Sequence, residues 1–286
     1  MRRFSFLLLA AILMFASCKK SEKEAIVRLH VNNFEVTQDD ISTRDEVPIA
    51  SVTNIEAVTL AFYTDAGAEQ YKVTQLKDDA TTYTTFGDFE CSLPMGSYTM
   101  VVLGYKTKEG SPFVLTSPTQ ASFTGNYAYE TFVNTQAVNI TNTSAVTLTA
   151  TLNRIVTMLQ VISTDNRPEE AVSIRMTVSA GSKSFNPTTG LATDDLGFNN
   201  TVAFSSAAGT TSSSGAYFFL ATDEETMDVT IDILNASGSS ISHKFISNVS
   251  FKRNRRSILT GSLYDAGAGS DFTVETDWLP NLNIGF

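Results

Sequence analysis

Apolar residues alternate with polar ones over many short stretches of the chain, and the stretches end at clusters of Gly, Asn, Asp, Ser and Pro. Successive side chains of a β-strand point to opposite faces of its sheet, so a strand with one buried face has this period of two. No stretch keeps a period of 3.6 residues over three helical turns. The pattern predicts an all-β protein of short, half-buried strands, and it is clearest at Val27–Val31, Val58–Phe62 and Val229–Ile233.

Breaks in this pattern predict two antiparallel β-sandwiches in tandem. Residues 25–144 would form the first and residues 145–286 the second, with the polar segment Asn139–Ser144 as a hinge between them. Two other stretches are expected to be loops. Thr116–Thr131 is polar with scattered aromatic residues, and Phe204–Gly215 is a low-complexity run of small residues that we expect to be mobile.

The N-terminal residues 1–17 have the pattern of a lipoprotein signal peptide. Two arginines precede an apolar run that is shorter than the ~20 residues of a transmembrane helix. Small residues then lead directly to Cys18, as in the lipobox of bacterial lipoproteins, although Phe15 stands where Leu is usual. We expect Cys18 to become the first mature residue and to carry lipid, with residues 18–24 as a charged tether. Acyl chains contribute about 0.8 kcal/mol for each buried CH₂, so several chains anchor stably.

Charge and cysteine content narrow the function further. The formal net charge is −10, which argues against nucleic acid as a partner, because that role needs clustered cations. Only Lys252–Arg256 is locally basic. The chain has two cysteines. If Cys18 carries lipid, Cys91 has no partner for an intramolecular disulfide, and we expect it to be a small apolar residue of a strand.

The sequence contains no pattern that indicates catalysis, a metal or a cofactor. His30 and His243 are isolated on alternating strands, and no nucleophile elbow, zinc-protease motif or phosphate loop is present. The acidic pairs at 78–79 and 194–195 lack the spaced oxygen ligands of a calcium loop. We therefore expect a protein that is not an enzyme and that has no metal site.

Five stretches together carry a resemblance to a known family. Arg154–Val161 and Phe272–Trp278 are similar to its first and last strands in the C-terminal domain, and Val249–Gly261 is similar to a late hairpin with a basic-Asn-basic-basic turn. Val58–Gly67 and Leu93–Tyr105 are similar to early strands. In this order they resemble the fimbrillins, the lipoprotein precursors of type V pili in Bacteroidales. The resemblance implies two transthyretin-like β-sandwiches.

The resemblance also implies a mechanism. The folded lipoprotein precursor reaches the outer membrane, an Arg-specific protease removes its first strand together with the lipid, and a strand of another subunit fills the vacated groove. The implied partners are other fimbrial subunits, the outer membrane, and host or bacterial surface receptors. We expect cleavage after Arg44, which lies in a polar segment. This cut would remove the strand that carries Val27, Leu29 and Val31.

The C-terminal end offers candidates for the strand that a neighbour would receive. Apolar residues alternate there on one phase, are interrupted by Pro280, and then resume. The same residues also suit an edge strand of their own sandwich, and the first group can stay in place while the second exchanges. The candidate donor residues are Phe272, Val274, Trp278, Leu282, Ile284 and Phe286.

Two other functions fit the same sequence. A fimbrial anchor would keep its lipid and first strand, and would end the polymer at the membrane. A surface lipoprotein that binds glycans would also consist of tandem sandwiches, with Tyr127, Tyr129 and Phe132 as its aromatic platform, although these three residues also suit loop anchors or core. The sequence pattern is the same for a stalk, a tip and an anchor protein of the pilus, so it does not distinguish these three positions.

Overall fold

The structure of the chain is a computed structural model. The part of the chain that it describes contains strands and no helices. That part is all-β, as the alternation predicted, and it contains no helix that could span a membrane. Backbone alone is described for residues 33–37, 44–48 and 277–278. The described residues are 23–37, 44–48, 55–79, 81–106, 112–125, 127–265 and 272–278.

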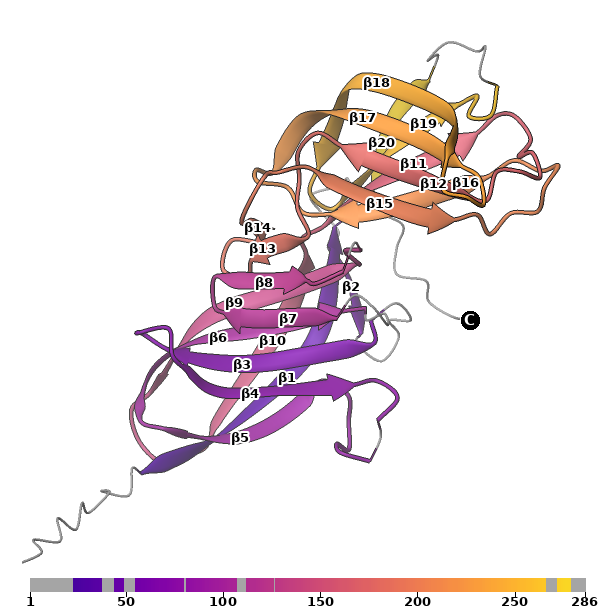
Figure 1. Cartoon of the computed structure of the whole chain (residues 1–286). Coiled ribbons are helices and arrows are strands. Elements are labelled where there is room, and N and C mark those ends of the chain that lie inside the picture. Colours follow the sequence, from indigo (N-terminus) through magenta and orange to yellow (C-terminus); the bar gives the residue numbers. More distant parts are fainter. Residues whose placement is uncertain are drawn as a thin grey trace, which may run out of the picture.

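A curled eight-stranded sheet forms the first lobe (Figure 1). Its order is β2-β1-β10-β9-β6-β3-β4, and β5 pairs with β1. The strands are β1 (Glu24–Thr37), β2 (Arg44–Pro48), β3 (Ala57–Thr64), β4 (Glu69–Leu76), β5 (Asp88–Pro94), β6 (Gly96–Tyr105), β9 (Thr131–Ile140) and β10 (Val146–Arg154).

A smaller sheet covers one face of β3 and β6. Its order is β14-β13-β8-β7. Because of this cover, β3 is buried on both faces: Ala61 and Tyr63 pack on the small-sheet side, whereas Leu60 and Phe62 pack inside the curl. The half-buried strand expected at Val58–Phe62 is therefore fully buried. The covering strands are β7 (Phe113–Ser117), β8 (Gln120–Phe123), β13 (Ser184–Asn186) and β14 (Leu191–Ala192).

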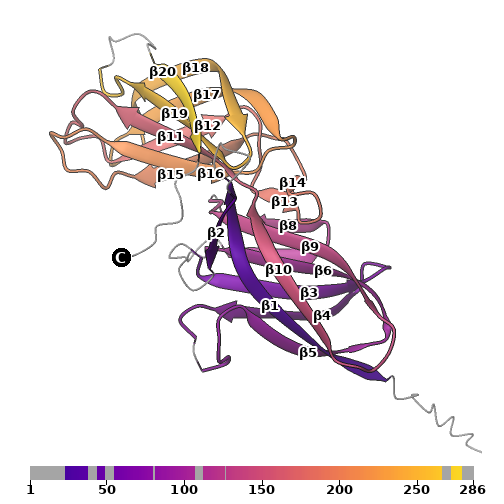
Figure 2. The same cartoon turned by 180° about the vertical axis from the view of Figure 1, so that it is seen from behind.

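The second lobe is a sandwich of two four-stranded sheets, β16-β11-β19-β20 and β15-β12-β17-β18 (Figure 2). Leu159 and Val161 of one sheet and Val229 and Ile231 of the other belong to one buried cluster. The strands are β11 (Thr157–Ser163), β12 (Ser173–Val178), β15 (Phe198–Ala203), β16 (Ser213–Phe218), β17 (Glu224–Leu234), β18 (Ser240–Lys252), β19 (Arg255–Gly261) and β20 (Thr273–Trp278).

Three segments differ from the sequence expectation. Residues 146–154 were placed with the second sandwich, but they form β10, which pairs with β1 and β9 of the first lobe. The expected loop at Thr116–Thr131 contains the end of β7 and all of β8. Two residues of β8 have partners far away in sequence, because Ala121 pairs with Phe185 and Phe123 stacks on Phe219. The segment expected to be mobile ends in β16, and backbone hydrogen bonds tie its residues 209–210 to Arg167.

Candidate functional site

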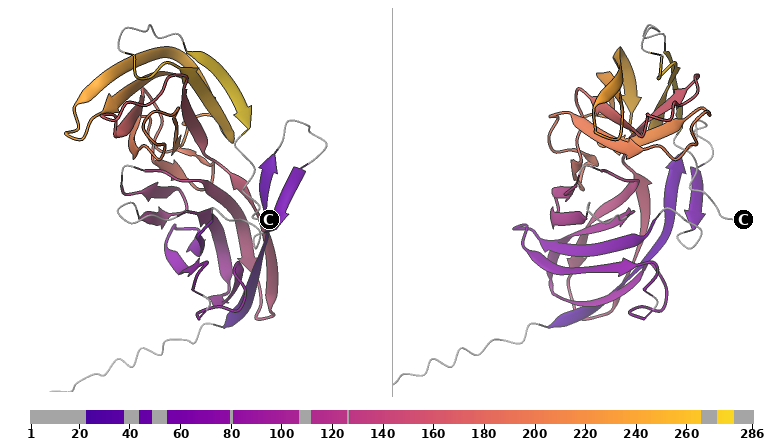
Figure 3. Two further views of the ribbon diagram at one scale, coloured as in Figure 1. Left: turned by 90° about the vertical axis from the view of Figure 1, so that its right-hand side faces the viewer. Right: turned by 45° about the vertical axis from the view of Figure 1, so that its right-hand side comes forward.

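β1 is a buried strand with partners on both edges. It pairs in parallel with β10 along one edge, and in antiparallel fashion with β5 and then β2 along the other. The β1–β2 pair runs along one side of the molecule, with its far end near the second lobe (Figure 3). The side chains that alternate inward are at most 2% exposed, and these are Ala25, Val27, Leu29 and Val31.

Apolar side chains on both neighbouring strands face these residues. Across the antiparallel ladder, Leu29 pairs with Phe89 and Val27 with Cys91. Cys91 is a buried free cysteine, and burial followed by the charge of Glu90 raises the pKa of its thiol to about 11. We call the space that β1 occupies between β5 and β10 the β1 slot. Without β1, this slot would present two unpaired strand edges and an apolar floor.

The outward face of β1 is mostly polar, with Ile26 as an exposed apolar residue among charged ones. Arg28 lies opposite Glu90, with 2.7 Å between Nε and Oε2, and His30 lies opposite Asp88 in the same ladder and forms a hydrogen bond with it. These side chains are about half exposed, so each pair contributes well under about 1 kcal/mol. The apolar face of β1 therefore holds the strand in its slot.

Arg44 is the first residue of β2, where it pairs with Thr37 of β1. The sequence indicates only a polar segment here, and the structure places the backbone of Arg44 at the start of a strand. β2 stands at the end of the strand order, so within the described chain its outer edge carries no partner strand. An extended backbone with an open edge is the form in which a β-strand accepts an added chain. The side chain of Arg44 and all of Cys18 lie outside the described residues.

β20 holds part of the candidate donor segment within the second lobe. It pairs with β19 as the outermost strand of its sheet, with Val274 opposite Leu259. Val274 is 46% exposed, whereas Phe272 packs partly against the core. Gly261 makes room for that ring, because a Cβ there would lie 2.6 Å from Phe272 Cδ1. The side chain of Trp278, and Leu282, Ile284 and Phe286 entirely, lie outside the described residues.

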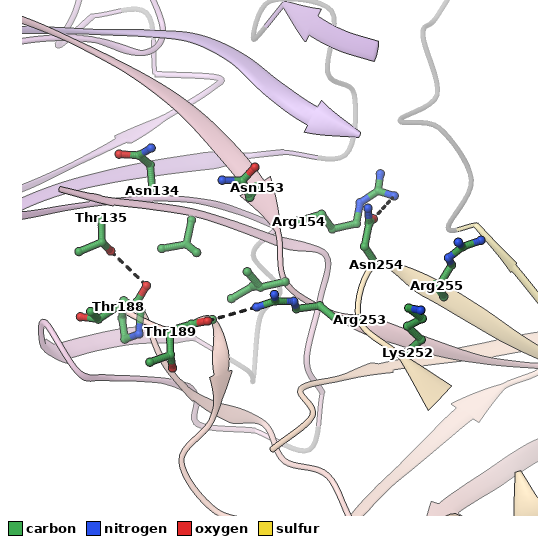
Figure 4. Close-up of a pocket in the computed structure, with 14 residues that line it drawn as sticks. Asn134, Thr135, Asn153, Arg154, Thr188, Thr189, Lys252, Arg253, Asn254 and Arg255 are labelled. Atoms are coloured by element: carbon green, nitrogen blue, oxygen red, sulfur yellow. Dashed lines mark hydrogen bonds between the residues drawn. The ribbon is translucent and has the colours of Figure 1, made fainter. Parts of the chain in front are cut away.

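Residues Lys252–Arg255 of the basic run border a cavity of about 460 Å³ at the junction of the two lobes (Figure 4). Its walls come from the ends of β9 and β10, from residues 187–190, and from the turn between β18 and β19. Two hydrogen bonds close one side: Arg253 Nη1 donates to Thr189 O at 3.1 Å, and Thr135 Oγ1 donates to Pro187 O at 3.1 Å. The basic turn thus connects the second lobe to the first.

Acidic partners neutralise most of the cations at this junction. Arg253 forms an ion pair with Asp223 at 2.8 Å, and Lys252 lies 3.6 Å from Glu224. An anion entering the cavity would compete with these carboxylates. The basic run therefore serves the joint between lobes better than it would serve a polyanionic ligand.

Arg154 is the centre of this joint. Its Nη2 lies 2.7 Å from Glu130 Oε1, and the two side chains are 0% and 6% exposed. The guanidinium also lies 5.2 Å from the centre of the Phe132 ring and donates from Nη1 to Asn254 Oδ1 at 3.3 Å. Burial lowers the pKa of Arg154, whereas the charge of Glu130 acts in the opposite direction. An arginine keeps its charge in such a place, so the pair is ionic.

A family model described as a family of unknown function, DUF6562, matches residues 57–282. The chain belongs to this family. The match begins at β3 and leaves β1 and β2 outside it. No functionally curated protein matches the sequence.

Several solved structures have the same fold as this DUF6562 chain. The fimbrial anchor protein Mfa2 from Porphyromonas gingivalis has a TM-score of 0.50 at 10% identity, over 90% of this chain and 98% of that one. A candidate adhesin from Bacteroides ovatus has a TM-score of 0.52 at 10% identity, over 91% and 96%. A candidate polysaccharide-binding protein from Bacteroides thetaiotaomicron has a TM-score of 0.51 at 11% identity, over 90% and 99%. The fimbrillin resemblance is thus confirmed at the level of the fold.

The DUF6562 fold also separates the three residues of the expected aromatic platform. Tyr127 and Tyr129 stack with ring centres 6.1 Å apart, but Phe132 is completely buried beneath Arg154. The ion pair of Arg154 and Glu130 was not predicted. The alternation along β10 could have indicated that Arg154 is buried, because Arg154 lies on the same face of the strand as buried Ala150 and Leu152. In the described part, no group of three His, Cys, Asp or Glu residues is placed to hold a metal.

Proposed function

We propose that this protein is a structural subunit of a cell-surface fimbria, exported as an outer-membrane lipoprotein and assembled by strand exchange. The observation that carries the proposal is β1, an N-terminal strand buried between β5 and β10. A cut after Arg44 would separate this strand from the other strands of its sheet. The fold shared with the fimbrial anchor protein Mfa2 supports the same class of function.

In this proposal, lipid on Cys18 holds the folded precursor at the outer membrane until a protease cuts after Arg44. The released fragment contains all of β1, and only residues 45–48 of β2 stay with the body. Because β20 already pairs with β19, the segment that enters a neighbour's slot is residues 279–286, which carry Leu282, Ile284 and Phe286. Fimbrial subunits are the partners, and the proposal includes no catalytic step and no cofactor.

An empty β1 slot would leave the trimmed subunit with a deficit in free energy. Full burial of a Val or Leu side chain contributes about 1.5–3 kcal/mol, and β1 buries Val27, Leu29 and Val31 almost completely. The trimmed subunit also loses ladder hydrogen bonds along β5 and β10. A strand from another subunit restores both contributions, so polymerisation is driven by the deficit that cleavage creates.

A fimbrial anchor is the alternative within the same class. An anchor would keep β1 in its slot and offer only its C-terminal segment, or another surface, to the polymer. The two roles differ in the fate of residues 1–44 and not in the fold. Resistance of the full-length protein to an Arg-specific protease would favour the anchor.

The test uses full-length protein with Cys18→Ser, incubated with an Arg-specific protease. We expect the protein to lose residues 1–44 as one fragment, which mass spectrometry would detect. We also expect filaments to grow, which electron microscopy would detect. Arg44→Lys should prevent both, whereas Arg28→Lys, inside the β1–β5 ladder, should leave both unchanged. Deletion of residues 279–286 should permit cleavage and prevent filaments. A trimmed protein that stays a stable monomer would contradict strand exchange.

A further inference from the structure

A second cavity, of about 280 Å³, lies where the second sandwich is open between β15 and β16. The segment just before β9, which belongs to the first lobe, forms another of its walls. None of its lining residues belongs to β1, β2 or β20. The cavity is therefore separate from the strands that would exchange. Its lining residues are Lys106, Tyr127, Ala128, Tyr129, Glu130, Asn200, Val202, Gly215 and Tyr217.

Three tyrosines give this cavity an aromatic lining. The rings of Tyr127 and Tyr129 are nearly parallel, with an angle of 15° between their planes. Tyr217 stands on β16, and its neighbourhood is fixed by a β-bridge to Ala128. Tyr127 Oη donates to Thr201 O at 2.7 Å, which ties the wall to β15. The β-bridge and this hydrogen bond thus position the aromatic rings before any ligand arrives.

Asn200 is the unusual residue of the cavity. It occupies an inward position of β15, two residues from Phe198 and two from Val202, and it is 3% exposed. Its Oδ1 is buried and accepts no hydrogen bond from the part of the chain that the structure describes. An apolar side chain would suit this position better, because a buried carbonyl without a donor destabilises the fold. A ligand hydroxyl that donates to Oδ1 would explain why an amide side chain, and not an apolar one, occupies this position.

The charges and hydroxyls around Asn200 define the class of ligand. Lys106 and Glu130 are the charged residues of the lining, and each faces an opposite charge: Glu56 at 3.9 Å and Arg154 at 2.7 Å. Burial, and then the charge of Glu130, raises the pKa of Tyr217 to about 12, so its hydroxyl stays neutral. The lining therefore suits a neutral ligand. Aromatic rings accept the apolar face of a ring, whereas the amide and hydroxyls require a ligand rich in hydroxyl groups.

We propose that this cavity binds a single sugar residue, with one ring face against the tyrosines and a hydroxyl donating to Asn200 Oδ1. The volume, about 280 Å³, lies just below the usual range for ligand pockets of about 300–1,000 Å³, so the cavity has room for one pyranose ring and not for a longer saccharide. A ligand with about 12 non-hydrogen atoms binds on the order of millimolar at ordinary ligand efficiency. On a fimbria, many copies of such a weak site would act together.

The first measurement is saturation-transfer NMR on the full-length protein with Cys18→Ser, using the methyl glycosides of glucose, galactose, mannose, fucose and N-acetylglucosamine. We expect at least one glycoside to bind with a dissociation constant in the millimolar range. Tyr127→Ala should weaken it by about tenfold or more. Tyr83→Ala is the matched control, because Tyr83 is a half-buried tyrosine of a different cavity, and it should leave binding unchanged.

Asn200→Val provides a readout that a purely structural role would not give. We expect this variant to lose sugar binding while its melting temperature stays equal to that of the parent or rises. A lower melting temperature with unchanged binding would overturn the proposal. So would the absence of binding by all five glycosides, or a loss of binding in Tyr83→Ala and not in Tyr127→Ala. These outcomes are independent of whether filaments form.

Discussion

At the scale of single residues, the turn between β18 and β19 depends on Asn254. Its φ of 60° lies in the left-handed region, its backbone N–H donates to Val156 O at 2.8 Å, and its side chain accepts from buried Arg154. Asparagine tolerates this conformation because its side chain is short and polar. A single residue thus shapes a turn and also completes the surroundings of the guanidinium.

Replacement of Asn254 separates these two contributions. Asn254→Ala should lower the free energy of unfolding by about 1–3 kcal/mol, because it adds backbone strain and removes a hydrogen bond to a buried charge. Asn254→Gly should cost less by roughly 1 kcal/mol, because glycine adopts positive φ without strain. Urea denaturation measures both. Equal losses in the two variants would show that the backbone conformation contributes nothing.

Asp165 gives the chain a pH dependence at the end of β19. Its carboxylate accepts hydrogen bonds from the backbone N–H groups of Leu263 and Tyr264 at 2.8 Å, and from Ser262 Oγ at 2.8 Å. Burial alone would raise the pKa of this carboxyl, but these hydrogen bonds outweigh it and hold the pKa below its ordinary 3.8. The folded state therefore favours the charged form more than the unfolded state does.

The sign of the effect follows from this lowered pKa. The contribution of Asp165 to stability is fully present above its ordinary pKa and is lost as the pH falls through the lower pKa of the folded state. Asp165→Asn should be less stable than the parent at pH 7, and the difference should shrink as the pH is lowered below about 4. Melting temperatures of both proteins across this range check it. A difference that grows toward low pH would be incompatible with this carboxylate clamp.

At the scale of elements, alternation predicted the strands well because it depends only on neighbouring residues. Val27, Leu29 and Val31 do share the buried face of β1, and Val229 and Ile231 share that of β17. Alternation could not show what covers the other face of a strand. The second face of β3 is buried by strands that lie about 50 or more residues further along the chain. Likewise, β10 pairs in parallel with β1, which lies more than 100 residues earlier in the sequence.

The two faces of β1 give a test at this scale. Val27→Asp places a carboxylate in the apolar cluster, where Val27 is 1% exposed, and should cost at least about 3 kcal/mol or prevent folding. Ile26→Asp, on the adjacent position that is 42% exposed, should change stability by less than about 1 kcal/mol. Denaturant midpoints of the two variants compare the faces directly. Similar costs would mean that β1 is not buried in solution as it is in this fold.

At the scale of the whole molecule, the two lobes share one hydrophobic cluster. Phe123 of the small sheet and Phe219 of the second lobe stack at 6.4 Å, and Phe185 lies 4.4 Å from Phe219, measured between ring centres. The ion pair of Arg154 and Glu130 lies in the same joint. The sequence suggested a polar hinge near Asn139–Ser144, but that segment is the end of β9 and the turn that leads to β10. The real boundary passes through buried residues, so composition could not locate it.

This joint should make the lobes unfold together. Calorimetry of the full-length protein should show one transition with equal calorimetric and van't Hoff enthalpies, because separate unfolding of either lobe would expose the phenylalanines of the other.

Glu130→Gln leaves a buried guanidinium without its counter-charge and should lower the free energy of unfolding by about 3–5 kcal/mol. The double variant Glu130→Leu with Arg154→Met removes both charges and should recover much of that loss. Two separate transitions in the parent protein would mean that the shared cluster does not couple the lobes. One transition in the parent that splits in Glu130→Gln would instead assign the coupling to the ion pair, since the phenylalanines are unchanged in that variant.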